Sequence, residues 1–209
     1  MKILIVDDHA VVRQGIKQIL SEMDEDCQIG EAANGGDAIR LLRQNAWDMV
    51  LLDIGLPGKN GIEVLKQIKA EWKRLPVLML SMYSEDQYAL RAIRGGASGY
   101  MTKEMAPDEL LNAIDKVRRG GRFISPEVAE KLVFELDEQS EELPHLSLSD
   151  REFEVLRMIA SGHTVSEIGD SLSLSVKTIS TYRARILEKM KMKHNAELTH
   201  YAIKHQLVD

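Results

Sequence analysis

Short apolar runs alternate with amphipathic segments over the first half of the chain. The runs predict strands near residues 2–6, 27–32, 49–52, 77–81 and 99–102. The segments between them carry apolar residues at helical spacing and predict helices near 10–22, 35–44, 61–72, 86–95 and 107–119. Strands that alternate with helices favour a parallel sheet covered on both faces.

From residue 146 the pattern indicates helices only. A capping box of Ser149 and Glu152 opens the first of them, and further helices are predicted near 166–172, 175–190 and 196–205. A short helix, a tight connector and a longer basic helix are the plan of a helix-turn-helix unit. We therefore expect three parts: a domain over 1–119, a linker over 120–145 with a short helix near 126–136, and an all-α four-helix domain over 146–209.

Composition and charge narrow the class of protein. Hydrophobic residues make up 44% of the 209-residue chain, which is ample for buried cores, and the single Cys27 excludes an internal disulfide framework. The chain has no apolar run of membrane-spanning length, so we expect a cytoplasmic protein with no membrane partner. The net charge of −6 hides a local basic stripe, since residues 177–193 hold six basic residues and only one acid, Glu188. Such a stripe favours contact with phosphate.

Polar side chains stand at the ends of four predicted strands. Carboxylates follow the first and third strands, a hydroxyl ends the fourth and an ammonium follows the fifth: Asp7, Asp8, Asp53, Ser81 and Lys103. Ligands of open α/β sheets bind beyond the carboxyl ends of the strands, where these groups would meet. Three converging carboxylates favour a hard cation such as Mg²⁺, and the hydroxyl and ammonium suit a phosphoryl group.

This constellation resembles the receiver domain of two-component response regulators over roughly residues 1–120. The resemblance implies a flavodoxin-like fold, a five-stranded parallel sheet of order 2-1-3-4-5. It implies that Asp53 is the phosphoacceptor, that Lys103 and Ser81 hold the phosphoryl oxygens, and that Ser81 and Tyr100 form a switch pair. The alternative for Tyr100 is a half-buried strand aromatic without a switching role.

The same resemblance implies a magnesium site. Asp8 and Asp53 would bind Mg²⁺ directly, Asp7 would act through water, and the backbone carbonyl of Gly55 would complete the shell. The residue after Lys103 is Glu104 where many receivers carry proline, so we expect a trans peptide bond or a shifted loop there.

The C-terminal domain resembles the LuxR-type output domain, so the whole chain resembles response regulators of the NarL/FixJ family. The string from Leu146 to Leu156, Ser161-Gly162 and Lys177-Thr178-Ile179 carry this resemblance. By family position Ser180, Thr181 and Ala184 would face base edges in the major groove. Contacts with the DNA phosphate backbone are expected from Lys177, Thr178, Tyr182, Arg183, Arg185 and Lys189. Gly169 departs from the alanine common there, and glycine costs about 1 kcal/mol in a helix.

The function implied is a DNA-binding transcription regulator. A sensor histidine kinase would phosphorylate Asp53, and phosphorylation would favour homodimerisation and promoter binding. No turnover enzyme is expected, although the domain could catalyse its own phosphorylation and dephosphorylation. Three alternatives stay open: an aspartyl-phosphate phosphatase, which Gly55 disfavours because that class has a second Asp there; a receiver that ignores phosphate; and a helical domain that binds only proteins.

Overall fold

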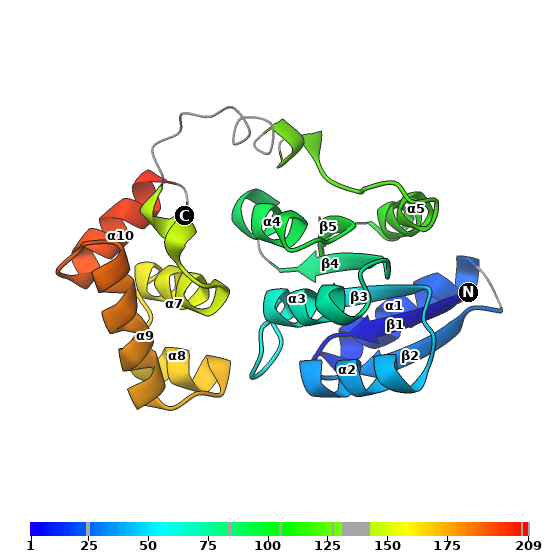
Figure 1. The fold of residues 1–209 in the computed structure, drawn as a ribbon, viewed down its shortest axis with the longest axis horizontal. Helices are drawn as coiled ribbons and strands as arrows, with labels where there is room; N and C mark the ends of the chain where they lie inside the picture. Colours follow the sequence, from blue (N-terminus) through cyan, green and yellow to red (C-terminus); the bar gives the residue numbers. More distant parts are fainter. Residues whose placement is uncertain are drawn as a thin grey trace. The chain divides into compact units, whose positions relative to one another are not determined.

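The protein forms two compact units, Met1–Leu136 and Asp137–Asp209 (Figure 1). The computed structural model describes residues 1–23, 26–82, 85–104, 106–126, 128–130, 143–205 and 207–208. In the first unit the strands are β1 (Lys2–Val6), β2 (Gln28–Ala32), β3 (Met49–Asp53), β4 (Val77–Ser81) and β5 (Gly99–Thr102). The helices between and after them are α1 (Ala10–Met23), α2 (Gly35–Gln44), α3 (Gly61–Glu71), α4 (Glu85–Arg94) and α5 (Pro107–Arg118).

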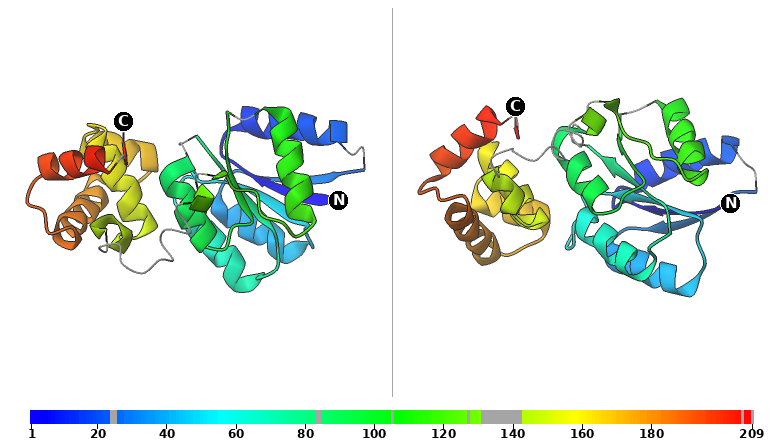
Figure 2. Two further views of the ribbon diagram at one scale, coloured as in Figure 1. Left: turned by 90° about the horizontal axis from the view of Figure 1, so that it is seen from above. Right: turned by 45° about the horizontal axis from the view of Figure 1, so that its top comes forward.

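All strand pairs are parallel and the order is β2-β1-β3-β4-β5, which confirms the predicted flavodoxin-like sheet. Helices α1 and α5 pack on one face, and α2, α3 and α4 cover the other (Figure 2). Strands β3 and β4 are buried throughout and β1 is buried from Ile3 onward, as their continuous apolar runs predicted. Because side chains alternate between faces, odd and even positions of one strand enter different cores. The core under α1 and α5 includes Ile3, Ile5, Leu20, Met49, Leu51, Leu78, Leu80, Met101 and Ile114.

The segment after α5 pairs with the outer edge of β5, which sequence reasoning did not foresee. Phe123 forms a parallel bridge with Gly99. Its N–H donates to the Ser98 carbonyl at 3.1 Å, and its carbonyl accepts from the Tyr100 N–H at 2.9 Å. The Phe123 side chain packs against the core under α5. A side chain at Gly99 would lie 2.7 Å from the Phe123 carbonyl oxygen, so only glycine fits this close approach.

The helix predicted near 126–136 lies mostly outside the described residues. Its start is described: Ser125 Oγ accepts the Val128 N–H at 3.3 Å, in agreement with its predicted role as N-cap. Pro126 and residues 128–130 are helical.

The second unit contains the predicted helices. They are α7 (Asp150–Ala160), α8 (Val165–Leu172), α9 (Val176–Lys189) and α10 (Asn195–Lys204), preceded by a 3₁₀ helix, η1 (Pro144–Ser147), that was not predicted. The capping box at α7 is confirmed, since Glu152 N–H donates to Ser149 Oγ at 3.3 Å and Ser149 N–H to Glu152 Oε2 at 2.8 Å. Ser175 caps α9 as predicted, accepting the Thr178 N–H at 3.1 Å.

Candidate functional site

The register of the sheet places the predicted acids side by side. Val6 of β1 pairs with Leu52 of β3, so Asp7 and Asp53 follow at adjacent strand ends. On the next pair, Ser81 of β4 lies opposite Thr102 of β5, directly before Lys103. The N–H of Lys103 donates to the Ser81 carbonyl at 2.7 Å. The carboxyl ends of four neighbouring strands therefore form one row of polar groups.

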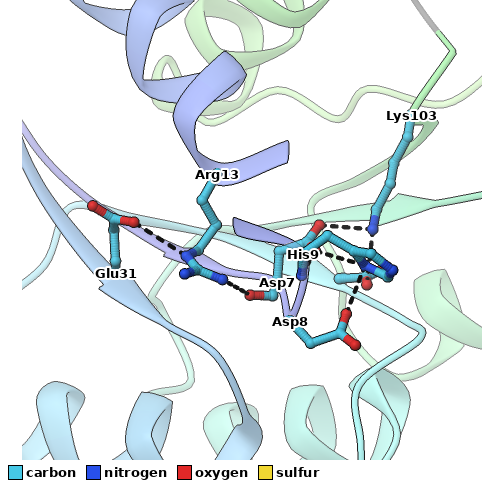
Figure 3. A network of polar contacts seen from close by, with 7 residues as sticks. Asp7, Asp8, His9, Arg13, Glu31 and Lys103 are labelled. Atoms are coloured by element: carbon cyan, nitrogen blue, oxygen red, sulfur yellow. Dashed lines mark hydrogen bonds and ion pairs between the residues drawn. The ribbon is translucent and has the colours of Figure 1, made fainter. Parts of the chain in front are cut away.

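Lys103 bridges the two buried carboxylates. Its Nζ lies 2.7 Å from Asp7 Oδ2 (Figure 3). It also lies 2.8 Å from Asp53 Oδ2, and the lysine side chain is 6% exposed. The ammonium is a compact positive charge shared by the two carboxylates. This contact ties β1, β3 and the end of β5 together at one point.

Burial and the neighbouring charges have opposing effects on the pKa values of Asp53 and Lys103. Burial raises the pKa of Asp53 above its usual range; the Lys103 ammonium and the Gly55 N–H oppose this rise, and the charge of Asp7 adds to it. Burial alone would lower the pKa of Lys103, but the ion pairs with Asp53 and Asp7 outweigh burial and raise it. The lysine is therefore held firmly as a cation, while Asp53 carries a charge that is costly to keep in its pocket.

Asp8 and His9 lie beside this buried pair. His9 Nδ1 is 2.8 Å from Asp8 Oδ1 and 3.3 Å from Asp7 Oδ1, and the His9 N–H donates to Asp7 Oδ1 at 2.8 Å. One ligand atom each from Asp7, Asp8, His9 and Asp53 lies within 4.8 Å of all the others. Sequence reasoning singled out the acids but not His9; its position directly after two of them was the available signal.

The donor set fits a divalent cation. Asp7 is fully buried, and its Oδ2 has no well-aligned hydrogen bond among the described residues despite the ion pair with Lys103. Carboxylate oxygens are the ligands that Mg²⁺ prefers. Three carboxyl groups meet one ammonium here, so a divalent ion would offset the excess of acidic groups.

A second contact holds the backbone of Asp7 in place. Arg13 on α1 donates from Nη1 to the Asp7 carbonyl at 2.7 Å and from Nε to Glu31 Oε2 at 3.1 Å (Figure 3). Lys17, one turn further along α1, donates to Glu31 Oε1 at 2.6 Å. Sequence reasoning missed this group, whose signal was two basic residues four apart on α1.

The remaining receiver residues lie close to the same row. Ser81 and Tyr100 are both buried, at 0% and 1% exposure, so Tyr100 is more deeply buried than the alternative expected, while its switching role stays a prediction. A side chain at Gly55 would lie 3.5 Å from Asp53 Oδ2, so the glycine keeps the approach to that oxygen open. The Lys103–Glu104 peptide bond is trans, as expected without a proline.

The helix-turn-helix places most of its predicted contact residues on an open face of α9. Ile179 and Ile186 point into the bundle, whereas Ser180, Thr181 and Ala184 are exposed. Lys177 and Arg185 are exposed as well, and Thr178 and Tyr182 are partly exposed.

Two of the predicted phosphate contacts on α9 already have partners. Lys189 Nζ donates to Glu152 Oε2 at 2.6 Å, and Arg183 Nε donates to Asn195 Oδ1 at 2.6 Å. Lys189 keeps an exposed side chain despite this contact, as do Lys177 and Arg185, whereas Arg183 is partly buried.

The turn between α8 and α9 explains the glycine in α8. Ser173 adopts the left-handed conformation, with φ of 54°, and the Leu174 N–H donates to the Gly169 carbonyl at 2.8 Å. A side chain at Gly169 would lie 2.8 Å from the Leu174 carbonyl oxygen. Glycine at position 169 therefore lowers the helix propensity of α8 but allows the Leu174 carbonyl to approach the helix closely.

This fold and these sites define a signal-receiving regulator with a DNA-binding output domain. The family described as the response regulator receiver domain matches residues 3–115, and that of bacterial regulatory proteins of the luxR family matches residues 146–202. The chain belongs to the NarL/FixJ family of two-component response regulators. That family consists of response regulators and transcription factors rather than turnover enzymes, so the phosphatase alternative is set aside.

Relatives match over nearly the full length. The response regulator UvrY of Escherichia coli is 37% identical over 208 residues, covering 99% of this chain and 95% of the relative. The response regulator GacA of Pseudomonas aeruginosa is 38% identical over 210 residues, covering 100% and 98%. RcsB of Salmonella enterica serovar Typhimurium, solved bound to promoter rprA with the phosphomimetic BeF₃⁻, is 27% identical with a TM-score of 0.63, covering 96% and 98%. Among the described residues, no helix has the length and hydropathy needed to cross a bilayer.

Proposed function

We propose that Asp53 receives a phosphoryl group from a sensor histidine kinase and that this event controls DNA binding by α9. The observation that carries the proposal is the Lys103 bridge between the buried carboxylates of Asp7 and Asp53. Asp8, Asp53 and the Gly55 carbonyl would hold Mg²⁺ directly and Asp7 through water. When bound, the ion neutralises negative charge that develops on the phosphoryl oxygens.

The carboxylate of Asp53 is the nucleophile. One of its oxygens forms the new bond to phosphorus while the bond from phosphorus to the kinase imidazole nitrogen breaks, and that nitrogen keeps the electron pair. Lys103 leaves the carboxylate oxygens and pairs with the phosphoryl group, and the Ser81 hydroxyl donates a hydrogen bond to another phosphoryl oxygen. The same groups allow self-phosphorylation by small phosphodonors and later hydrolysis, with no other substrate turned over.

The switch lies in β4 and β5. Movement of Ser81 toward the phosphoryl group leaves space that the buried Tyr100 ring fills by turning further inward. Two buried side chains on neighbouring strands make such a change discrete rather than gradual, because a packed core does not deform continuously. The active arrangement favours a homodimer, which matches paired half-sites on double-stranded DNA.

DNA recognition is assigned to α9 in the major groove. Ser180, Thr181 and Ala184 face base edges, and because these small side chains discriminate weakly, much of the affinity comes from phosphate. The phosphate contacts are Lys177, Thr178, Tyr182, Arg183, Arg185 and Lys189. The division into a receiver over 1–119, a linker over 120–145 and an output domain over 146–209 belongs to this proposal. So does a cytoplasmic location, where the promoter DNA is.

Intact mass spectrometry tests the phosphorylation. The full chain is incubated with Mg²⁺ and acetyl phosphate beside Asp53→Ala and a control, Asp115→Asn, which alters a partly exposed carboxylate on α5. We expect one added phosphoryl group on the wild type and on the control and none on Asp53→Ala. Equal addition to all three proteins would overturn the assignment of Asp53.

Fluorescence anisotropy with promoter DNA tests the interface. Arg185→Ala should weaken binding and reduce the slope of log K against log salt by about 1, because one phosphate contact is lost. Lys204→Ala, which removes an exposed charge on α10, serves as the matched control and should leave the slope unchanged. Binding that is identical with and without phosphodonor would support a phosphate-independent receiver instead.

A further inference from the structure

The His9 ring lies beside the carboxylates of Asp7 and Asp8, in a position to act as an additional metal ligand. Its Nδ1 lies 2.8 Å from Asp8 Oδ1 and 3.3 Å from Asp7 Oδ1, and it belongs to the four-residue group whose ligand atoms all lie within 4.8 Å. The His9 side chain is 64% exposed, so solvent and ions reach the ring while Asp7 and Asp53 are buried. In the proposed function above, the metal is held by oxygen atoms only.

The distances match the coordination shell of one small ion. With bonds of about 2.1 Å in an octahedral shell, neighbouring donors lie about 3.0 Å apart and opposite donors about 4.2 Å. The separations of His9 Nδ1 from Asp8 Oδ1 and Asp7 Oδ1 fall near the first value. The His9 imidazole nitrogen and the Asp8 carboxylate oxygen, 2.8 Å apart, can therefore serve as adjacent ligands without a change of backbone, and Asp7 keeps its place beside them.

A second observation points to a cation at this place. The single ammonium of Lys103 is shared between the buried carboxylates of Asp7 and Asp53, at 2.7 and 2.8 Å, so the three acids of the cluster have one cation between them. Arg13 does not neutralise the acids, because its guanidinium bonds to the Asp7 carbonyl and to Glu31. The cluster thus has negative charge in excess and one nitrogen donor on its open side.

We propose that His9 is a ligand that selects among metal ions: through Nδ1 it binds a divalent transition ion such as Co²⁺, Ni²⁺ or Zn²⁺, whereas Mg²⁺ uses the carboxylates without it. The inference rests on the proposed function of the acidic pocket. Imidazole suits the later divalent ions of the first transition row, while Mg²⁺ keeps to oxygen ligands and water. A transition ion at this site competes with Mg²⁺ for Asp8 and Asp53.

The test is calorimetric titration of the full chain with MgCl₂ and, separately, with CoCl₂. His9→Asn is the informative variant, because its amide can still hydrogen-bond Asp8 but offers no imidazole nitrogen. We expect His9→Asn to bind Mg²⁺ as the wild type does and Co²⁺ about 10-fold more weakly or worse. His163→Asn removes a ring exposed in the turn after α7 and should match the wild type with both ions.

Proton NMR of the Co²⁺-loaded protein gives a readout that a merely positioning role would not move. Ring protons of an imidazole bound to the ion shift far outside the usual range. We expect such signals in the wild type and in His163→Asn, and their loss in His9→Asn. Equal Co²⁺ affinity in wild type and His9→Asn, with unchanged shifted signals, would overturn the assignment and leave His9 as a residue that only orients Asp8.

Asp8→Asn separates this inference from the function on which it rests. If Asp8→Asn weakens Mg²⁺ binding while His9→Asn leaves Co²⁺ binding intact, the acidic site stands and the role of His9 fails. If Asp8→Asn leaves Mg²⁺ binding unchanged, the proposed metal site fails and the His9 inference with it.

Discussion

Replacing glycine by alanine should have opposite effects on the free energy of unfolding at two helical glycines of the first unit. A methyl group at Gly61, the first residue of α3, would lie 2.0 Å from the Asp53 carbonyl oxygen and 2.7 Å from Ile54 Cα. This is about 1.4 Å inside ordinary van der Waals contact, which begins near 3.4 Å. At Gly15, in the middle of α1, the same methyl group meets no atom within 4 Å.

The size of each effect follows from what the methyl group meets. At Gly61 the obstacle is the backbone of β3, so relief requires moving the strand end that carries Asp53. Overpacking against adaptable side chains costs about 1–3 kcal/mol, and against this backbone we expect about 3 kcal/mol or more. At Gly15 alanine should stabilise the protein by up to about 1 kcal/mol, because alanine has the higher helix propensity.

Urea unfolding followed by tryptophan fluorescence measures both variants. The two tryptophans, Trp47 and Trp72, lie in the first unit, so their emission reports its unfolding. With a slope of about 2 kcal/mol per molar urea, Gly61→Ala should lower the midpoint by roughly 1.5 M and Gly15→Ala should raise it by up to about 0.5 M. A Gly61→Ala protein that unfolds at the wild-type urea concentration would refute the argument that a methyl group at Gly61 displaces the strand end that carries Asp53.

Three further predictions concern single polar groups. Because burial raises the pKa of Asp53, the protonated carboxyl favours the folded state at acid pH, and this contribution is lost as pH rises through the raised pKa. Asp53→Asn should therefore raise the urea midpoint at neutral pH, by an amount that shrinks toward acid pH. A difference in midpoint that is the same at every pH would contradict burial as the cause. Ser175→Ala removes the N-cap of α9 and should cost about 1 kcal/mol in chemical denaturation followed by circular dichroism, with no loss if the cap is dispensable. Tyr201→Phe breaks the 2.8 Å hydrogen bond to the buried His145 Nδ1 and should lower the stability of the second unit by about 1–3 kcal/mol; an unchanged thermal midpoint would count against it.

The sheet and the acids of the pocket could be predicted because doubly buried strands have a plain signature. Asp7 and Asp53 end continuous apolar runs, and in a parallel sheet the ends of neighbouring strands meet. The Lys103 bridge and the place of His9 could not be derived in the same way. They depend on side-chain directions and distances within a few ångströms, which apolar periodicity does not determine.

Glycines show the same limit of sequence reasoning. The helix-propensity cost at Gly169 is a local property and was visible in the sequence. The reason to keep Gly169, its approach to the Leu174 carbonyl, depends on how the chain returns after the left-handed Ser173. Gly61 belongs to the same class, since its obstacle is the backbone of β3, eight residues earlier.

The bridge between Phe123 and β5 has a consequence for the receiver as a separate fragment. An edge strand with unpaired N–H and carbonyl groups is a template for association with another chain, and natural proteins commonly cover such edges. Phe123 covers part of β5 by bonding to Ser98 and Tyr100 and adds its ring to the core. A fragment cut at residue 119 loses this cover and should self-associate at concentrations where a fragment extending to residue 125 stays monomeric.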